Sequence, residues 1–507
     1  MLAALGGALY CLGYLGFGVW PLAWICLAPL WQALEEIRAR PLRTSALLGF
    51  TFAWVAHAGG YRWLWRLVEV FLGGNLVLGA ALWLAHSAFF ALAFAIYAGL
   101  YRRVRQQGRS VAVAGIPPLL ALEWLYPSLF PVHLGDTLVD RTLLLQIVDL
   151  GGPLLASALV ALVNLAVFES WRWRRRERPR PDAVWLCAGL ALFASAAYGM
   201  ARIDAVSRSL AGAPLLRVGL VQGNLGVLEK RREAALVHRR YLEQTRELLA
   251  EGGELDLVVW PETVYSRGLK GPFPISGEGI REELRVPILF GAATVRTEGG
   301  RRRTYNSALL IGADGVIQAG YDKNLPVPFA EKVPLADRIP ALAALFPHAQ
   351  EFGTGSGAPA LALGPWRIST PICSESAEPA FVRRMLAQAD PHLIASLAND
   401  AWFGDSQEPW IHLAVARLRA AEHKRFLVHA TNSGVSAVVD PFGRVIARSG
   451  LLTRENLRAT VRLRDAQTIY ARLGDWPGWL ALAVLLATAI RNPRAARAAR
   501  GTPRSGW

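Results

Sequence analysis

Residues 367–376 read Arg-Ile-Ser-Thr-Pro-Ile-Cys-Ser-Glu-Ser, and a charged helical stretch at 377–388 follows them directly. The composition of the first six residues predicts a β-strand over 367–372, which gives way to a helix. Cys373 lies at this junction. A thiol close to a helix N-terminus is expected to feel the positive end of the helix dipole, which favours the thiolate. Cys373 is therefore a candidate nucleophile.

The segment from 205 to 472 has the pattern of one α/β domain. Turn residues at 313–315 and 440–443 separate the arms of hairpins. Strands and helices that alternate in this way predict a layered α/β fold. The predicted strands are 216–221, 255–260, 287–292, 307–311, 316–321, 360–363, 367–372, 392–397, 426–431 and 435–439, and the predicted helices are 228–250, 377–388 and 410–424.

The residues before this domain predict a helical membrane bundle over 1–204. A mean hydropathy of +0.27 with only 19% charged residues is too apolar for an ordinary soluble protein. Residues 1–34 carry no charged side chain, and Gly16, Gly18 and Pro21 favour two short spans there over one long span. We expect about seven spans before the domain and a last one over 473–491. The apolar runs behind this prediction are 44–61, 73–100, 111–126, 152–168, 183–201 and 476–490.

The basic residues predict the orientation of these spans. Arginines crowd the loops at 38–43, 102–109 and 172–180, whereas the alternate loops hold only Arg62, Arg66 and Arg141. The positive-inside rule places the arginine-rich loops and the basic tail at 492–507 in the cytoplasm, and the α/β domain outside it. The net charge of +16 is then mainly a signal of topology, so we expect no nucleic-acid partner.

Cys373 is the only thiol in the predicted outer domain, because Cys11, Cys26 and Cys187 lie in apolar runs. No disulfide can form within that domain. A single thiol in an oxidising compartment indicates function, although a buried cysteine that only packs as a small apolar side chain is the alternative.

Two more side chains follow predicted strands. Glu262 comes after 255–260, where a solvated or helix-capping carboxylate is the alternative reading. Lys323 comes after 316–321 and is one of five lysines against fifty arginines, which suggests a need for a compact ammonium rather than an ordinary surface lysine. The histidines of the domain lack the spacing of known metal motifs, so we expect neither a metal nor a cofactor.

A glutamate, a lysine and a cysteine that leave strands in this order form a pattern similar to the nitrilase superfamily. Within that superfamily the chain resembles the apolipoprotein N-acyltransferases over essentially its whole length. The stretches that carry the resemblance are Val221-Gln222-Gly223-Asn224, residues 396–404 (Ser-Leu-Ala-Asn-Asp-Ala-Trp-Phe-Gly), His412, Arg417, Ala420, Glu422, Arg425 and residues 430–436 (Ala-Thr-Asn-Ser-Gly-Val-Ser).

The resemblance implies an αββα sandwich and a role for each site residue. Glu262 matches the general base, Lys323 the lysine that stabilises the oxyanion, and Cys373 the nucleophile, while Glu331 and Glu375 match two supporting glutamates. There are departures around the site. The family usually has tyrosine where this chain has Ser374, and Lys-x-His-Leu-Val-Pro-Phe-Gly-Glu where residues 323–331 read Lys-Asn-Leu-Pro-Val-Pro-Phe-Ala-Glu.

The resemblance further implies transfer of a fatty acyl chain from a phospholipid, through a thioester, to the α-amine of a diacylglyceryl-modified apolipoprotein. The enzyme is expected in the inner membrane as a monomer with its domain on the periplasmic side. Such a site must open onto lipid, and Leu325, Phe329, Trp402 and Phe403 are expected to line its entrance, with core packing as the alternative for the aromatic residues.

Two other functions remain open at this point. A membrane-tethered amidase or nitrile hydrolase would use the same three residues with water as the acceptor. The second alternative function is a polytopic scaffold with an inactive domain. The departures at Ser374 and Leu325 are the only features that favour this alternative.

Overall fold

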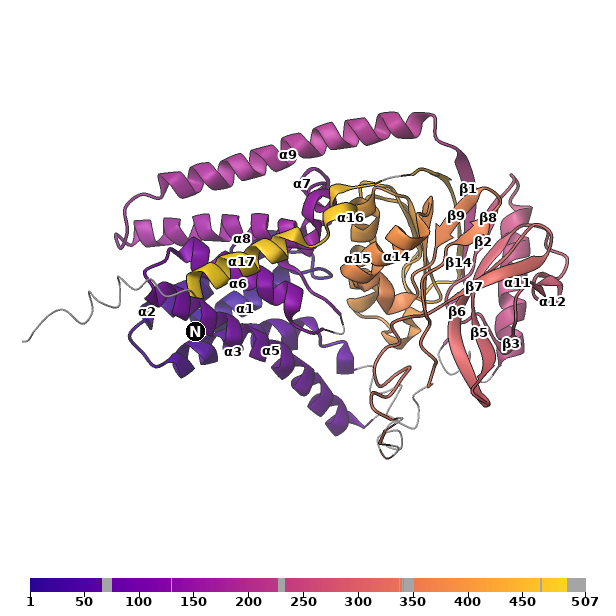
Figure 1. Ribbon diagram of the computed structural model, residues 1–507, viewed down its shortest axis with the longest axis horizontal. Helices are drawn as coiled ribbons and strands as arrows, with labels where there is room; N and C mark the ends of the chain where they lie inside the picture. The colour runs from indigo at the N-terminus through magenta and orange to yellow at the C-terminus, as the bar shows by residue number, and fades with distance from the viewer. Residues whose placement is uncertain are drawn as a thin grey trace, which may run out of the picture.

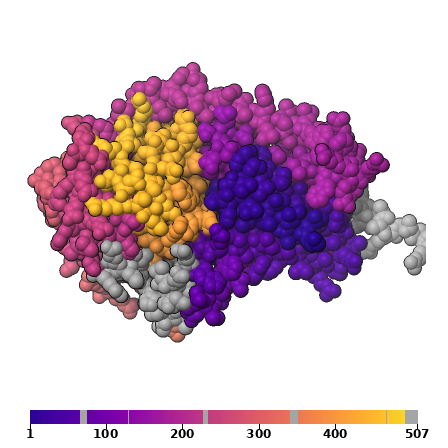
Figure 2. All heavy atoms as spheres, turned by 180° about the vertical axis from the view of Figure 1, so that it is seen from behind, coloured from indigo at the N-terminus to yellow at the C-terminus, as the bar shows by residue number. Residues whose placement is uncertain are grey.

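The computed structural model describes residues 1–65, 75–128, 130–226, 233–336, 338–339, 341, 351–465 and 467–489. It has an N-terminal helical part and a nitrilase-like α/β part with two mixed sheets, side by side along the long axis (Figures 1 and 2). The predicted basic tail at 492–507, the end of the last predicted span at 490–491, and residues 73–74 and 228–232 of two predicted helices lie outside the described residues.

The helical part contains three helices that are long and apolar enough to cross a membrane, within the described residues. These are α5 (Leu76–Gln106), α8 (Val148–Arg174) and α9 (Asp182–Ala211). The shorter helices of the described residues around them are α1 (Leu2–Gly13), α2 (Leu27–Glu36), α3 (Leu42–Gly60), α6 (Val111–Leu125), α7 (Thr142–Leu145) and, at the far end of the chain, α16 (Ile469–Leu473) and α17 (Trp476–Ala489). The predicted total of about seven spans stays a prediction.

The break predicted within residues 1–34 is present. Helices α1 and α2 are separated by the short 3₁₀-helix η1 (Trp20–Trp24). Gly16 and Gly18 have φ angles of 84° and 78°, a left-handed backbone that only glycine adopts without strain, so one continuous helix cannot form.

The α/β part has four layers (Figure 1). One sheet has the order β14-β1-β2-β5-β6-β7-β4, with β3 also on β5, and the other has the order β13-β12-β11-β10-β9-β8. Helices α14 (Pro379–Ala389) and α15 (Glu408–His423) cover the second sheet on the side of the bundle, and α11 (Ala234–Ala250) covers the first. The predicted αββα sandwich is thus confirmed. The strands are β1 (Leu215–Gln222), β2 (Leu257–Val259), β3 (Tyr265–Lys270), β4 (Ile275–Ser276), β5 (Ile288–Glu298), β6 (Arg301–Ile311), β7 (Val316–Asp322), β8 (Leu361–Leu363), β9 (Trp366–Ser369), β10 (Leu393–Ala398), β11 (Leu427–Thr431), β12 (Ala437–Val439), β13 (Val445–Arg448) and β14 (Glu455–Arg462).

Successive side chains of a strand point to opposite faces of the sheet, and the buried side chains of the two faces belong to two separate cores. In β2, Leu257 and Val259 belong to the core that also contains Ile394 of the second sheet, whereas Val258 belongs to the core that contains Tyr241 of α11. Both faces of this strand are buried. A short continuous apolar run is the expected sequence of such a strand.

Helix α15 joins the α/β part to the bundle. Arg417 donates a hydrogen bond of 2.8 Å to the carboxylate of Asp140, and the fully buried Lys424 donates one of 2.6 Å to the side-chain oxygen of Gln146. Lys424 also lies 3.7 Å from the carboxylate of Asp149 at the start of α8. These contacts fix the second sheet, and the turn at Cys373 that precedes α14, against the helical part.

Candidate functional site

The three candidate residues come from both sheets. Glu262 follows β2 and Lys323 follows β7 in one sheet, whereas Cys373 follows β9 in the other. Because the sheets pack face to face, the ends of these strands meet between them. Cys373 starts the short 3₁₀-helix η3 (Cys373–Ala377) and has a φ of 52°, a left-handed conformation that costs a non-glycine residue about 1–2 kcal/mol.

A hydrogen-bonded group of charged side chains surrounds Lys323. Its ammonium lies 2.7 Å from Glu331 Oε2 and 3.7 Å from Glu262 Oε1, and its side chain is 1% exposed. The amide of Asn306 donates to Glu262 at 2.6 Å and to Glu331 at 3.0 Å. Burial by itself lowers the pKa of Lys323, but the two carboxylates outweigh it and hold that pKa above its usual value. The lysine is therefore charged at neutral pH.

The Cys373 thiol is half-buried and lies in the field of the same charges. Burial raises the pKa of Cys373 well above its usual value; the carboxylate of Glu262 adds to this rise, and the ammonium of Lys323 opposes it. Burial and the Glu262 carboxylate thus act against the thiolate that a helix dipole was expected to favour. Helix α14 begins only at Pro379, with η3 in between, so the dipole of a long helix does not act directly on the sulfur. A reaction at this sulfur would therefore need a base to remove the thiol proton.

Glu375 connects the lysine loop to the cysteine turn. Its Oε1 accepts hydrogen bonds from the backbone of Asn324 and Leu325 at 2.6 and 3.0 Å. Its Oε2 accepts from the hydroxyl of Tyr321 and the backbone of Ile372 at 2.7 and 2.8 Å. This fully buried carboxylate thus fixes the distance between the segments that carry Lys323 and Cys373.

Comparison with known proteins finds a family match for each of the two parts of the chain. Residues 6–166 match the family described as apolipoprotein N-acyltransferase N-terminal domain, and residues 217–471 match carbon-nitrogen hydrolase. Proteins named apolipoprotein N-acyltransferase are 30% identical in Geobacter metallireducens (97% of this chain, 95% of the relative) and 33% identical in Gloeobacter violaceus (96% and 92%). This chain belongs to the apolipoprotein N-acyltransferase family.

Solved structures are similar to about half of this family member. Saccharomyces cerevisiae Nit3, of the nitrilase superfamily, covers 51% of this chain and 93% of its own, with 16% identity and a TM-score of 0.39. The carbon-nitrogen hydrolase superfamily protein XC1258 from Xanthomonas campestris covers 58% and 100%, with 20% identity and a TM-score of 0.37.

The predicted entrance residues of this N-acyltransferase family member have different surroundings. Leu325 and Phe329, in the loop after β7, are 38% and 47% exposed. Trp402 is half-buried, and Phe403 is only 7% exposed, with its ring edge-on to Trp63 of the helical part at 5.2 Å. The loop residues are thus open to the surroundings, while Phe403 packs at the junction between the two parts.

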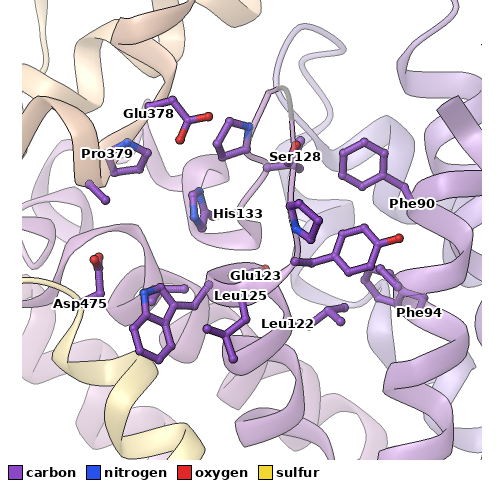
Figure 3. Close-up of a pocket in the computed structure, with 18 of the residues that line it drawn as sticks. Phe90, Phe94, Leu122, Glu123, Leu125, Ser128, His133, Glu378, Pro379 and Asp475 are labelled. Atoms are coloured by element: carbon purple, nitrogen blue, oxygen red, sulfur yellow. The ribbon is translucent and has the colours of Figure 1, made fainter. Parts of the chain in front are cut away.

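A cavity of about 310 Å³ lies at the same junction (Figure 3). Its wall combines rings such as Phe90 and Phe94 of α5 with the polar side chains of Glu123, His133 and Glu378. Glu378 lies in the segment that follows the turn at Cys373. Leu325, Phe329, Trp402 and Phe403 are not among the lining residues in the described part of the chain.

Several residues at this site were not predicted from the sequence. Asn306 and Tyr321 contact the charged residues from β6 and β7, and no sequence pattern marks either one. Asp400 and His412 were noted only as part of the family resemblance. Together with His429 they form the one group among the described residues whose ligand atoms, all within 4.8 Å, could hold a metal ion. Asp400 and His412, however, already bind each other at 2.8 Å.

Proposed function

We propose that this protein transfers a fatty acyl chain from a phospholipid, through a thioester on Cys373, to the α-amine of the diacylglyceryl-cysteine at the N-terminus of an apolipoprotein. The observation that carries the proposal is that the Lys323 ammonium lies 3.7 Å from the Glu262 carboxylate. The charges of both groups influence the pKa of the half-buried Cys373 thiol. The full-length relatives that are named apolipoprotein N-acyltransferase support the choice of substrates.

The first half-reaction forms the thioester. Glu262 takes the proton of Cys373 while the sulfur attacks the ester carbonyl of the phospholipid. The ammonium of Lys323 and a backbone N–H next to Cys373 stabilise the oxyanion, an interaction typically worth about 3–4 kcal/mol for each donor. When the carbon–oxygen bond breaks, Glu262 returns the proton to the departing lysophospholipid.

The second half-reaction uses the same groups in the reverse order. The α-amine of the lipoprotein attacks the thioester carbonyl, and Glu262 accepts a proton from the nitrogen. The tetrahedral intermediate collapses to an amide, and the sulfur leaves as a thiolate that is protonated again. One base and one oxyanion site therefore serve both steps.

The acyl donor explains why the α/β part is joined to a membrane bundle. At roughly 0.8 kcal/mol per methylene, moving a 16-carbon chain from lipid into water costs on the order of 12 kcal/mol. We place residues 205–472 on the periplasmic face of the inner membrane, between spans in 1–204 and 473–491. The exposed Leu325 and Phe329 would then meet the lipid at the entrance. A monomer is sufficient for this arrangement.

The test is intact-protein mass spectrometry of the detergent-purified chain after incubation with phospholipid alone. We expect a fatty-acyl mass gain that hydroxylamine removes and that Cys373→Ala lacks, followed by its loss when a diacylglyceryl-modified peptide is added. A folded parent protein that gains no mass from phospholipid but hydrolyses small amides would contradict the proposal and support the amidase.

A further inference from the structure

A buried pair of side chains, His412 and Asp400, contacts the backbone of Cys373 through the imidazole of His412. The imidazole of His412 on α15 lies with Nε2 at 3.2 Å from the carbonyl oxygen of Cys373 and at 3.0 Å from the hydroxyl of Ser376. Its Nδ1 lies 2.8 Å from the carboxylate of Asp400. The hydroxyl of Ser376 donates a further hydrogen bond of 2.9 Å to the same carbonyl.

The partners of His412 determine its charge. The Ser376 hydroxyl gives its one proton to the Cys373 carbonyl, and a carboxylate and a carbonyl oxygen have none to give. Both ring nitrogens therefore donate, and the ring is an imidazolium. Two other titratable side chains face it, Glu408 one turn earlier on α15 and His429 on β11. Burial raises the pKa of Glu408 and, with the nearby His412, lowers the pKa of His429 to about 3. Burial thus disfavours the charged form of both neighbours of His412.

The carboxylate of Asp400 fits only because residue 434 is a glycine. A Cβ added to Gly434 would lie 2.1 Å from Asp400 Oδ2, so only glycine at this position leaves room for the carboxylate. Asp400 itself is 1% exposed and His412 is 5% exposed. The pair is therefore held in one place by its surroundings and can hold the Cys373 carbonyl in turn.

The Cys373 carbonyl and the Ser374 N–H belong to one planar trans peptide, in which these two groups point in opposite directions. Fixing the carbonyl toward His412 therefore fixes the N–H on the other side. Among the described residues, the Ser374 N–H has no hydrogen-bond partner, and the adjoining Cys373 has the strained φ of 52°. Without the pair behind it, this peptide could rotate toward an unstrained conformation.

We propose that His412 and Asp400 are positioning residues that orient the peptide between Cys373 and Ser374, so that the Ser374 N–H joins Lys323 in binding the oxyanion. The inference rests on the proposed function only in taking Cys373 as the nucleophile. It does not depend on which acyl donor or acceptor the enzyme uses.

The test compares His412→Gln with His412→Asn in the full-length, detergent-purified chain. Both variants lose the ring and its charge. The amide nitrogen of glutamine can replace Nε2 as the donor to the Cys373 carbonyl, whereas that of asparagine replaces Nδ1 and reaches only Asp400. His238→Gln is the control, since this buried histidine binds the backbone of Ile280 on the outer face of the other sheet.

Two reactions of Cys373 are measured. The first is the burst of 4-nitrophenolate from 4-nitrophenyl butyrate, which requires an oxyanion site. The second is alkylation by iodoacetamide, a displacement at a saturated carbon that forms no oxyanion. We expect the burst to slow about 100-fold in His412→Asn and less than about tenfold in His412→Gln. Alkylation is expected to change by about threefold or less in both.

Equal burst rates in the two His412 variants would overturn the inference, because the donor to the carbonyl would then not matter. A parallel loss of burst and alkylation would also overturn it, since that result indicates a general collapse of the turn. A parent chain in which the ester does not acylate Cys373 would remove its premise. A parent that shows the burst but takes no acyl group from phospholipid would contradict the proposed function alone.

Discussion

The hydroxyl of Tyr321 donates a hydrogen bond of 2.7 Å to Glu375 Oε2. Tyr321 is on β7, two residues before Lys323, and Glu375 is two residues after Cys373 in a strand crossover of the other sheet. This contact between fully buried side chains therefore joins the segment of Lys323 to the segment of Cys373 across the interface of the two sheets.

Tyr321→Phe is expected to slow acylation of Cys373 by only about tenfold and to cost about 1–2 kcal/mol of stability, because Glu375 keeps its three backbone donors.

Glu375→Gln is expected to slow acylation of Cys373 by about 100-fold. The glutamine amide would present N–H groups to the N–H donors that now bind Glu375, and the lysine loop would move. Burst kinetics with an activated ester measure both. Tyr305→Phe, whose hydroxyl binds the half-exposed Glu298, is the matched control, and a parent-like rate in Glu375→Gln would contradict the argument.

Asn306→Asp is expected to reduce the acylation rate by about 100-fold and to lower the melting temperature in detergent. The Asn306 amide donates to both Glu262 and Glu331, and a carboxylate in its place would put three acids around the one ammonium of Lys323. One acid must then take up a proton, and Glu262 loses its fixed position. Asn456→Asp, at the pairing of β14 with α11, should leave the rate unchanged. Equal loss in both variants would show that the effect is not local.

Glu262→Gln is expected to shift the pH profile of Cys373 alkylation toward lower pH. The carboxylate of Glu262 is, after burial, the largest cause of the raised pKa of Cys373, so its removal lowers that pKa and more thiolate forms at a given pH. Iodoacetamide rates between pH 6 and 10 measure the shift. The same variant should abolish acyl transfer, for which it lacks a base. Glu254→Gln, an exposed acid elsewhere, is the control, and an unshifted profile in Glu262→Gln would contradict the assignment.

The stability of the protein is expected to decrease as the pH rises toward 9. Burial lowers the pKa of His412, but the carboxylate of Asp400 outweighs burial and raises this pKa to about 9, above the usual value of about 6.5. The folded state therefore holds this proton more tightly than the unfolded state. The stabilisation is complete below about pH 6.5 and is lost as the pH passes about 9, on the order of 3 kcal/mol in all. Melting temperatures across this range should fall in the parent and change less in His412→Gln; identical slopes would exclude His412 as the source.

Much of the fold follows from local pattern. Each of the ten predicted strands overlaps an observed one, because strands such as β2 and β10 are buried on both faces and read as short apolar runs. Strands β3, β4, β13 and β14 were not predicted. Strand β14 reads Glu-Asn-Leu-Arg-Ala-Thr-Val-Arg and is mostly half-buried at the edge of its sheet, so no apolar run marks it.

The sequence by itself determined which residue types stand at strand ends, namely Glu262, Lys323 and Cys373, because each follows a recognisable run. Only the tertiary structure decided what surrounds them. Asn306, Glu375 and His412 contact partners far away along the chain, and such contacts arise from how two sheets and a helix pack. The same packing reversed the expected effect on the Cys373 thiol, since burial and a nearby carboxylate, rather than a helix dipole, control its pKa.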